Sequence, residues 1–152
     1  MMMWEHRALS GISWDMSDPE FAETKVERFQ YENEDADDFE ESMRGEFVPL
    51  AEEEWTSLVH PQGMAFQLQC HFDDRADPFS QTDHQKLYEY PDGRQWGLTI
   101  MHNVSIRFEL FIPARATVRD LLHMLGSLRF RCGYFEGLLF KDSTHAELRW
   151  GT

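Results

Sequence analysis

The chain has 152 residues, of which 41% are hydrophobic and 14% aromatic, and its formal net charge at pH 7 is −14. This length suits one domain, and the aromatic content is too high for a wholly disordered chain. The strong negative charge disfavours direct binding of nucleic acid or of an anionic membrane, because both are polyanions, and favours a basic protein partner. We therefore expect a single domain over residues 1–152.

The acidity is concentrated in the first third of the chain. Residues 1–56 hold 17 acidic and 4 basic side chains, whereas residues 57–152 hold 11 acidic and 10 basic ones. Within the first part, residues 32–54 contain 11 acids and a single arginine. We divide the predicted domain into an acidic helical region, 1–60, and a near-neutral body of sheet and helix, 61–152.

Three short amphipathic helices are predicted in the acidic region. The first begins at 18–20, where Asp-Pro-Glu supplies an N-cap, a proline at the first helical position and an acid in the first turn. The second covers 36–43, where Ala, Phe and Met recur at i, i+3 and i+7. The third begins near residue 50 and places Trp55, Leu58 and Val59 on one face.

After residue 64 the hydrophobic period changes from helical spacing to alternation. Alternating apolar and polar residues predict strands at 66–72, 86–90, 96–100, 104–112, 133–141 and 146–150. Leucines at helical spacing predict a helix over 118–128, with Thr117 as its cap. The predicted fold is α+β: acidic N-terminal helices, then a mainly antiparallel sheet of about five to six strands with one long helix of the C-terminal half packed on it.

One segment has a local resemblance to a known family. The predicted hairpin that leads into Thr-Val-Arg-Asp-Leu-Leu (117–122) resembles the strand–strand–helix opening of β-grasp, ubiquitin-like sulfur carriers, over about a sixth of the chain. The resemblance implies a hairpin followed by a helix. The chain ends in Arg-Trp-Gly-Thr (149–152) and lacks the Gly-Gly tail that those carriers need for activation, so no function is carried over.

No motif in the sequence identifies a catalytic activity, and no cofactor or metal is predicted. The glycine-rich patterns of phosphate-binding loops and the Gly-x-Ser-x-Gly pattern of hydrolases are absent. Cys70 and Cys132 are too few for a disulfide framework and are expected to be reduced. The possible metal ligands, which lack the close paired spacing of metal motifs, are His60, His71, His84, His102, Cys70 and Asp73.

The expected compartment is the cytoplasm. The N-terminal residues contain no continuous apolar segment typical of a secretory signal. The longest strongly apolar stretch, 104–112, contains charged residues and is far shorter than the ~20 residues that span a bilayer. The sequence predicts no oligomeric state.

The acidic block is the strongest candidate for a functional surface. A dense negative charge costs stability through self-repulsion, and Tyr31, Phe39 and Trp55 among the acids would supply apolar anchors for a partner. The predicted partner-binding residues are Glu32, Glu34, Asp35, Asp37, Asp38, Phe39, Glu40, Glu41, Glu52, Glu53 and Glu54.

These features favour a non-enzymatic inhibitor that covers the basic, nucleic-acid-binding surface of a nuclease, of a nucleic-acid-guided defence complex or of a toxin. In size and composition the chain resembles phage inhibitors of host defence that mimic DNA, such as anti-CRISPR proteins, and immunity proteins against nuclease toxins.

Two alternatives stay open. One is a small enzyme or ligand-binding domain with its site on the sheet, built from His71, His102, Arg107 and Glu109. The other is a structural or assembly subunit. A solubilising role for the acidic surface is the simplest alternative to binding.

Overall fold

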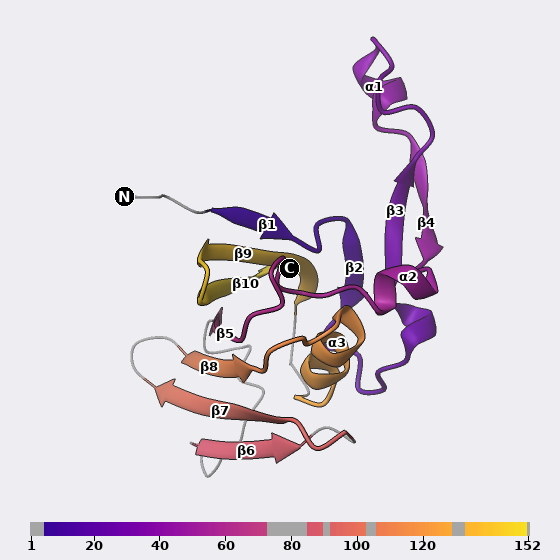
Figure 1. Cartoon of the computed structure of the whole chain (residues 1–152). Coiled ribbons are helices and arrows are strands. Elements are labelled where there is room, and N and C mark those ends of the chain that lie inside the picture. The colour runs from indigo at the N-terminus through magenta and orange to yellow at the C-terminus, as the bar shows by residue number, and fades with distance from the viewer. Residues whose placement is uncertain (1–4, 73–84, 90–91, 103–105, 129–132, 152) are drawn as a thin grey trace.

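The computed structural model describes residues 5–72, 85–89, 92–102, 106–128 and 133–151. Strands predominate over helices in these residues (Figure 1). The strands are β1 (His6–Ala8), β2 (Ile12–Asp15), β3 (Glu27–Tyr31), β4 (Gly45–Pro49), β5 (Phe66–Phe72), β6 (Gln85–Glu89), β7 (Gln95–His102), β8 (Ile106–Ile112), β9 (Tyr134–Asp142) and β10 (His145–Gly151). The helices are a 3-10 turn, η1 (Glu23–Lys25), and α1 (Phe39–Ser42), α2 (Glu52–Trp55) and α3 (Val118–Gly126).

The strands follow the order β4-β3-β2-β9-β10-β5-β8-β7-β6, with β1 paired to β9 beside β2. Neighbours are antiparallel except β10 and β5, which run parallel and pair Ala146 with Leu68. The strands predicted after residue 64 are present, but the predicted sheet of five to six antiparallel strands is wrong, because the described sheet is larger and mixed. Alternation shows which face of a strand is buried and does not specify its neighbours.

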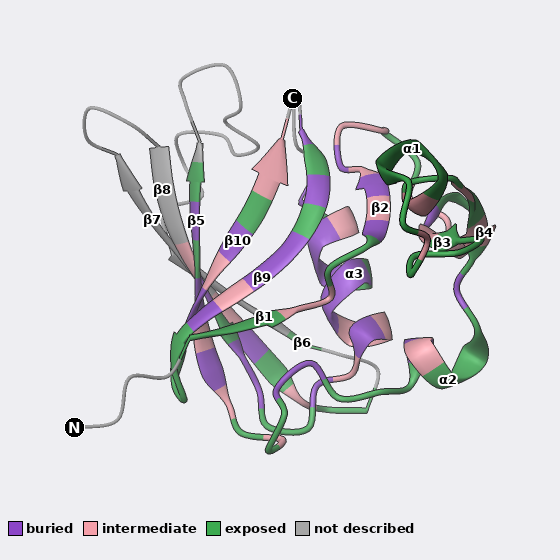
Figure 2. Ribbon diagram, turned by 90° about the horizontal axis from the view of Figure 1, so that it is seen from above, coloured by how far each residue is buried: buried purple, intermediate pink, exposed green. Residues whose placement is uncertain are grey.

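The hydrophobic core lies between the sheet and α3. Four side chains of α3 that point at the sheet, Val118, Leu121, Leu122 and Leu125, have at most 1% exposure. Figure 2 shows α3 against one face of the sheet, with buried and exposed residues alternating along β9 and β10. Burying each such aliphatic side chain contributes about 1.5–3 kcal/mol relative to exposure, so this layer is the main stabilising element.

Helix α3 begins where the sequence predicted. The Thr117 hydroxyl accepts a hydrogen bond from the Asp120 amide, and the Asp120 carboxylate accepts one from the Thr117 amide, forming a capping box. The hairpin of β7 and β8 leads into this helix. The helix has nine residues, so the prediction of one long helix is wrong.

The predicted N-terminal helical region is wrong. Residues that were predicted to form the first helix lie in a turn and in β3, and α1 and α2 have four residues each. At 15–20 the acids stabilise turns: the Ser17 amide donates to Asp15 at 2.9 Å and the Glu20 amide donates to Asp18 at 3.0 Å. The Asp18 side chain therefore accepts the bond that an N-cap accepts, but the chain that follows forms only the three-residue η1 and then β3.

Strands β3 and β4 form a hairpin that projects from the body and has α1 at its end (Figure 1). We call residues 27–49 the arm and residues 32–44 its tip. The Glu32 amide donates to the Arg44 carbonyl at 3.0 Å, which closes the hairpin. A Cβ at Gly45 would overlap the carbonyl of Gln30 and the ring of Phe29, so the close approach of the two strands requires glycine.

Strand β9 pairs with β10 along one edge and with both β1 and β2 along the opposite edge. A bulge in β9 separates the part paired with β1 from the part paired with β2. Ala8 pairs with Leu138 and Trp14 with Phe135, and between them Gly137 has a φ of +106°. A Cβ at Gly137 would lie 2.7 Å from the Ala8 carbonyl oxygen. Glycine therefore lets the N-terminal segment cross close to β9 and enter the arm from the body.

In the part of the chain that the structure describes, no helix is long and apolar enough to cross a membrane.

Candidate binding surface

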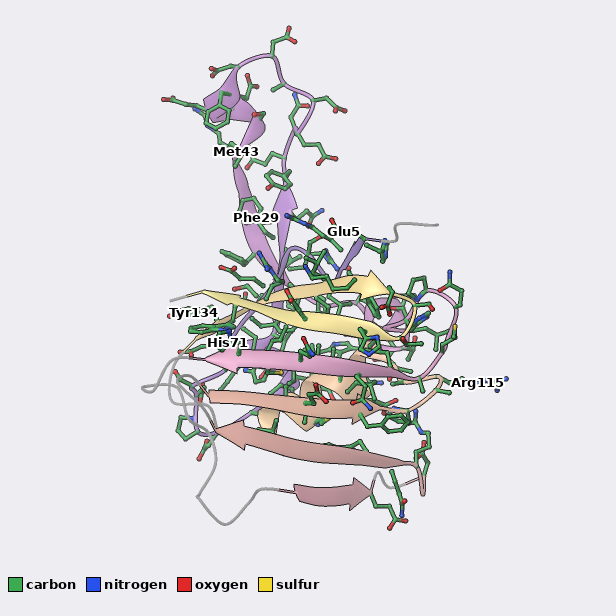
Figure 3. The ribbon with its side chains drawn as sticks, turned by 90° about the vertical axis from the view of Figure 1, so that its left-hand side faces the viewer. Glu5, Phe29, Met43, His71, Arg115 and Tyr134 are labelled. Atoms are coloured by element: carbon green, nitrogen blue, oxygen red, sulfur yellow. The ribbon has the colours of Figure 1, made fainter. Side chains whose placement is uncertain are left out.

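The tip of the arm gathers seven of the predicted partner-binding acids. All seven are exposed, and none forms an ion pair with a described residue. They are Glu32, Glu34, Asp35, Asp37, Asp38, Glu40 and Glu41. The single basic residue of the tip sequence, Arg44, is also exposed. Because the tip projects from the body (Figure 3), its carboxylates can reach a partner before the body makes contact.

The three other predicted acids lie at the base of the arm, in α2, apart from the tip (Figure 1). Glu52 accepts hydrogen bonds from Arg119 at 2.8 and 2.9 Å, and Glu54 forms an ion pair with Arg28 of β3. Glu53 is exposed. Glu52 and Glu54 therefore connect elements of the protein itself, and the acidic block is divided into a tip and a base.

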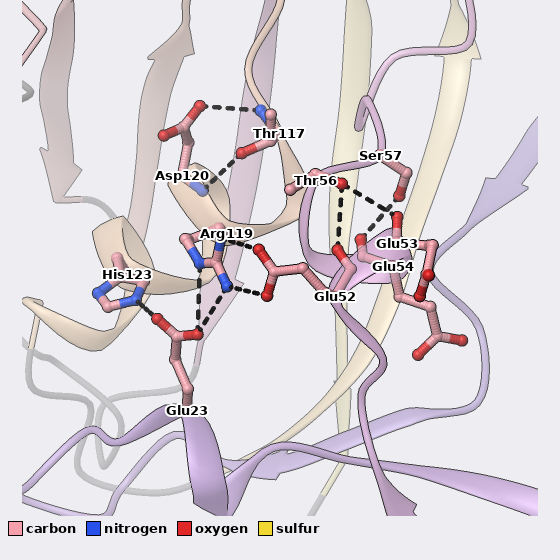
Figure 4. A network of polar contacts seen from close by, with 10 residues as sticks. All are labelled: Glu23, Glu52, Glu53, Glu54, Thr56, Ser57, Thr117, Arg119, Asp120 and His123. Atoms are coloured by element: carbon pink, nitrogen blue, oxygen red, sulfur yellow. Dashed lines mark hydrogen bonds and ion pairs between the residues drawn. The ribbon is translucent and has the colours of Figure 1, made fainter.

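Arg119 is the centre of the network that joins the base of the arm to α3 (Figure 4). It donates to Glu23 as well as to Glu52, and its guanidinium carbon lies 5.5 Å from the centre of the Trp55 ring. These hydrogen bonds, first those to Glu52, raise the pKa of Arg119. The arginine therefore stays charged and ties η1 and α2 to the helix.

Glu23 also accepts a hydrogen bond from His123 of α3 at 2.7 Å. Burial would raise the pKa of Glu23, but the hydrogen bonds from His123 and Arg119 outweigh burial and lower it. The network fixes the position of the arm's base on the body.

One face of the arm carries aromatic side chains. The Phe29 ring packs edge-to-face on Tyr31, with centroids 4.8 Å apart, and on Phe47, with centroids 5.2 Å apart. Tyr31 and Phe47 are 42% and 54% exposed, and Phe39 at the tip is 75% exposed. Phe39 and Tyr31 are therefore exposed at the surface, whereas Trp55 is 4% exposed and belongs to the core.

Phe29 and Phe47 lie on the arm's surface and were not among the predicted binding residues. The signal was present: Phe29 and Tyr31 are two positions apart, as on one face of a strand, and Phe47 follows at the same spacing from Gly45. The alternation was not interpreted as a strand, because the acidic residues between the two strands favoured the prediction of an amphipathic helix.

The alternative site predicted on the sheet has four residues, and the strand register does not align all four. The register pairs His71 with Arg107, and the next residues on that face, Gln69 and Glu109, are paired through a hydrogen bond of 3.3 Å. His102 pairs with Ile106, one residue out of step with Arg107. The register therefore places His71 opposite Arg107 and two positions along the strand from the Gln69–Glu109 pair, and it places His102 out of step with them.

The described surface has a shallow pocket at the β1 side of the sheet. Its lining combines two arginines with a glutamate and small or apolar residues: Arg7, Ala8, Ser10, Glu136, Leu138 and Arg149. The two arginines and one glutamate give this lining mixed charge.

Two of the candidate metal ligands, Cys70 and His60, are buried and have structural surroundings. Cys70 is buried, and burial raises the pKa of its thiol well above the usual value. His60 is 2% exposed; its Nε2 lies 2.7 Å from the Ser143 carbonyl and its Nδ1 accepts from the Gln62 amide at 2.9 Å. His84, Asp73 and Cys132 lie outside the described residues. Among the residues described, no cluster of three or more His, Cys, Asp or Glu side chains is arranged to hold a metal ion.

Comparisons with protein-family models, with curated proteins and with solved structures find no match for this chain.

Proposed function

We propose that this chain is a non-enzymatic, cytoplasmic inhibitor whose arm binds a basic surface of a partner protein and blocks the nucleic acid that the surface would otherwise hold. The observation that carries this proposal is the contrast in charge pairing. The tip's seven carboxylates have no basic partner among the described residues, whereas Asp18, Glu23, Glu52, Glu54 and Asp120 of the rest of the chain all do.

Unpaired carboxylates on a projecting hairpin suit electrostatic recognition. Their mutual repulsion is unfavourable in the free protein and is relieved when lysine and arginine side chains of a partner approach. The same positive surface of a nuclease, defence complex or toxin would attract phosphates, so the tip and a nucleic acid compete for it. Anti-defence proteins such as anti-CRISPRs and immunity proteins to nuclease toxins act on partners of this kind.

The test is capture of basic proteins on the immobilised full chain. We expect the wild-type chain to retain proteins from a nuclease-treated lysate and to release them when a DNA duplex is added. We also expect the affinity for these proteins to weaken about tenfold as the salt concentration is raised. A variant with Asp35→Asn, Asp37→Asn and Asp38→Asn should retain much less. The captured protein is then purified, and its nucleic-acid binding is measured with and without the chain.

A matched control separates the tip from the overall charge. Glu5→Gln, Glu89→Gln and Glu136→Gln remove three exposed acids outside the tip, so this variant has the same net charge as the tip variant. The control should bind as the wild type does. Equal loss in both variants, or full binding by the tip variant, would contradict the proposal.

A second candidate function is binding of a small anionic ligand on the open face of the sheet. The observation that favours it is the register that pairs His71 with Arg107 beside Glu109. Thermal shift in the presence of inorganic phosphate or of nucleotides tests this candidate. A stabilisation that is lost in the His71→Ala variant would support it, and unchanged melting with each ligand would count against it.

A further inference from the structure

We propose that the aromatic face of the arm is a docking surface for an apolar strip on the partner, and that this strip is bordered by basic side chains. We define the aromatic face as Phe29, Tyr31 and Phe47. This inference rests on the proposed function, because the acidic tip determines the charge of the partner, and it adds that the contact is not purely electrostatic.

The arm has two different faces. Phe29 and Phe47 are a cross-strand pair, and Tyr31 follows on the same face, opposite Gly45. The register pairs Gln30 with Glu46, and alternation places these polar residues on the other face. Tyr31 and Phe47 are about half exposed, so the apolar side of this hairpin faces water in the free protein.

An exposed group of aromatic rings on a two-stranded hairpin has a cost. A hairpin of two strands is marginally stable without a surface to cover its apolar face, and contiguous apolar surface on a soluble protein marks interaction sites. Phe39, which is 75% exposed at the tip, and Met43, which is 50% exposed, extend the apolar character toward the carboxylates. The apolar and acidic parts of the arm are therefore continuous.

The charge of the tip selects among possible occupants. A second copy of this chain would bring two sets of seven carboxylates together, which is unfavourable. A basic partner with an apolar strip satisfies both parts of the arm: its lysines and arginines meet the tip, and its apolar strip covers the rings of Tyr31 and Phe47. Aromatic anchors within a charged rim are typical of the residues that dominate binding energy.

The experiment uses two peptides of equal length as probes: oligolysine, and a lysine–leucine peptide that forms an amphipathic basic helix. We expect the full chain to bind the amphipathic peptide about tenfold more tightly than oligolysine at about 0.15 M salt, where the Debye length is about 8 Å. The tip variant with Asp35→Asn, Asp37→Asn and Asp38→Asn should weaken binding of both peptides. The variant with Tyr31→Ser and Phe47→Ser should lose the preference and keep the affinity for oligolysine.

The chain offers a matched control in Tyr134→Ser with Phe111→Ser. These two residues are 49% and 41% exposed and lie in β9 and β8, away from the arm. The control should keep the preference for the amphipathic peptide. A Tyr31→Leu and Phe47→Leu variant, which retains apolar area and strand structure, should keep most of the preference for the amphipathic peptide. That result would exclude loss of the hairpin as the cause of the change in the serine variant.

Three results would overturn the inference. They are equal affinity of the wild type for both peptides, loss of the preference in the Tyr134 and Phe111 control, and a wild-type dimer that becomes monomeric when Tyr31 and Phe47 are replaced by serine. A different result would contradict the proposed function: the wild type and the tip variant would bind oligolysine equally well.

Discussion

Among the described residues, acidic side chains that form ion pairs occur in the body and not in the tip of the arm. In the body, carboxylates cap a helix, close turns and hold two arginines, as Asp120, Asp142 and Glu52 illustrate. In the tip of the arm, the acids have no described cationic partner and are exposed. Net charge alone therefore does not distinguish the acids that stabilise the fold from the exposed acids that the tip concentrates on one projecting segment.

The largest difference in stability between the arm and the body is expected when a side chain of the core is truncated. Phe140 is fully buried, and its ring centroid lies 4.8 Å from that of Phe66. Phe140→Ala should lower the free energy of unfolding by about 3–5 kcal/mol. Phe47→Ala, on the arm, should lower it by less than about 1 kcal/mol. Urea denaturation measures both, and similar losses would mean that the arm belongs to the cooperative core.

A smaller loss of stability is expected at the base of the arm. Arg119→Met keeps an apolar stem against Trp55 and removes the ion pairs with Glu23 and Glu52. The melting temperature should fall by less than in Phe140→Ala. Arg149→Met is the control, because Arg149 is about half exposed and its pair with Glu147 is 3.8 Å long. An equal decrease in both variants would show that the network at Arg119 does not stabilise the fold.

The pH dependence of stability should report on acids of the body. The Thr144 amide and the His145 ring, both hydrogen-bonded to Asp142, lower its pKa to about 2 from the usual 3.8. Because the carboxyl has the lower pKa in the folded state, its stabilisation is complete above the unfolded pKa and is lost as pH falls toward 2. Asp142→Asn should therefore melt below wild type at pH 7, and the difference should narrow toward pH 2. A difference that is constant with pH would argue against this assignment.

The smallest effect is expected at the tip. The variant with Asp35→Asn, Asp37→Asn and Asp38→Asn should change the free energy of unfolding by no more than about 0.5 kcal/mol, because it removes no described ion pair. Asp120→Asn, which weakens the α3 cap and the contact with Arg94, should be clearly destabilised in the same assay. A strong loss of stability in the tip variant would show that the acids of the tip, like those of the body, stabilise the fold.

The body's elements could be predicted because one face of each is buried. Leu68 and Cys70 alternate with polar residues in β5, and Leu121, Leu122 and Leu125 follow helical spacing in α3. In both cases burial against the core imposes the period. The neighbours of each strand could not be predicted, because the pairing of β5 with β10 joins segments that are far apart in the chain.

The arm could not be predicted in the same way because its aromatic face is exposed: Tyr31 is 42% and Phe47 54% exposed. Phe29, Tyr31 and Phe47 are an alternating set, but the core does not select their face. Glutamate and aspartate have low strand propensity, and their density between the strands favoured a helical interpretation. The location of seven acids in one candidate surface was predicted from charge; the hairpin that presents them was not.

The parallel pairing of β5 with β10 has a consequence for the order in which the chain acquires its structure. Leu68 pairs with Ala146, so β5 has an open edge until the last described strand is available. Phe29 pairs with Phe47 over a much shorter separation, and local contacts form faster than distant ones. We expect the arm to form early and the sheet to close late, and pulse-labelled hydrogen exchange can follow both. During synthesis, the strands of the arm can already pair with each other while the unpaired edge of β5 is still exposed to other chains.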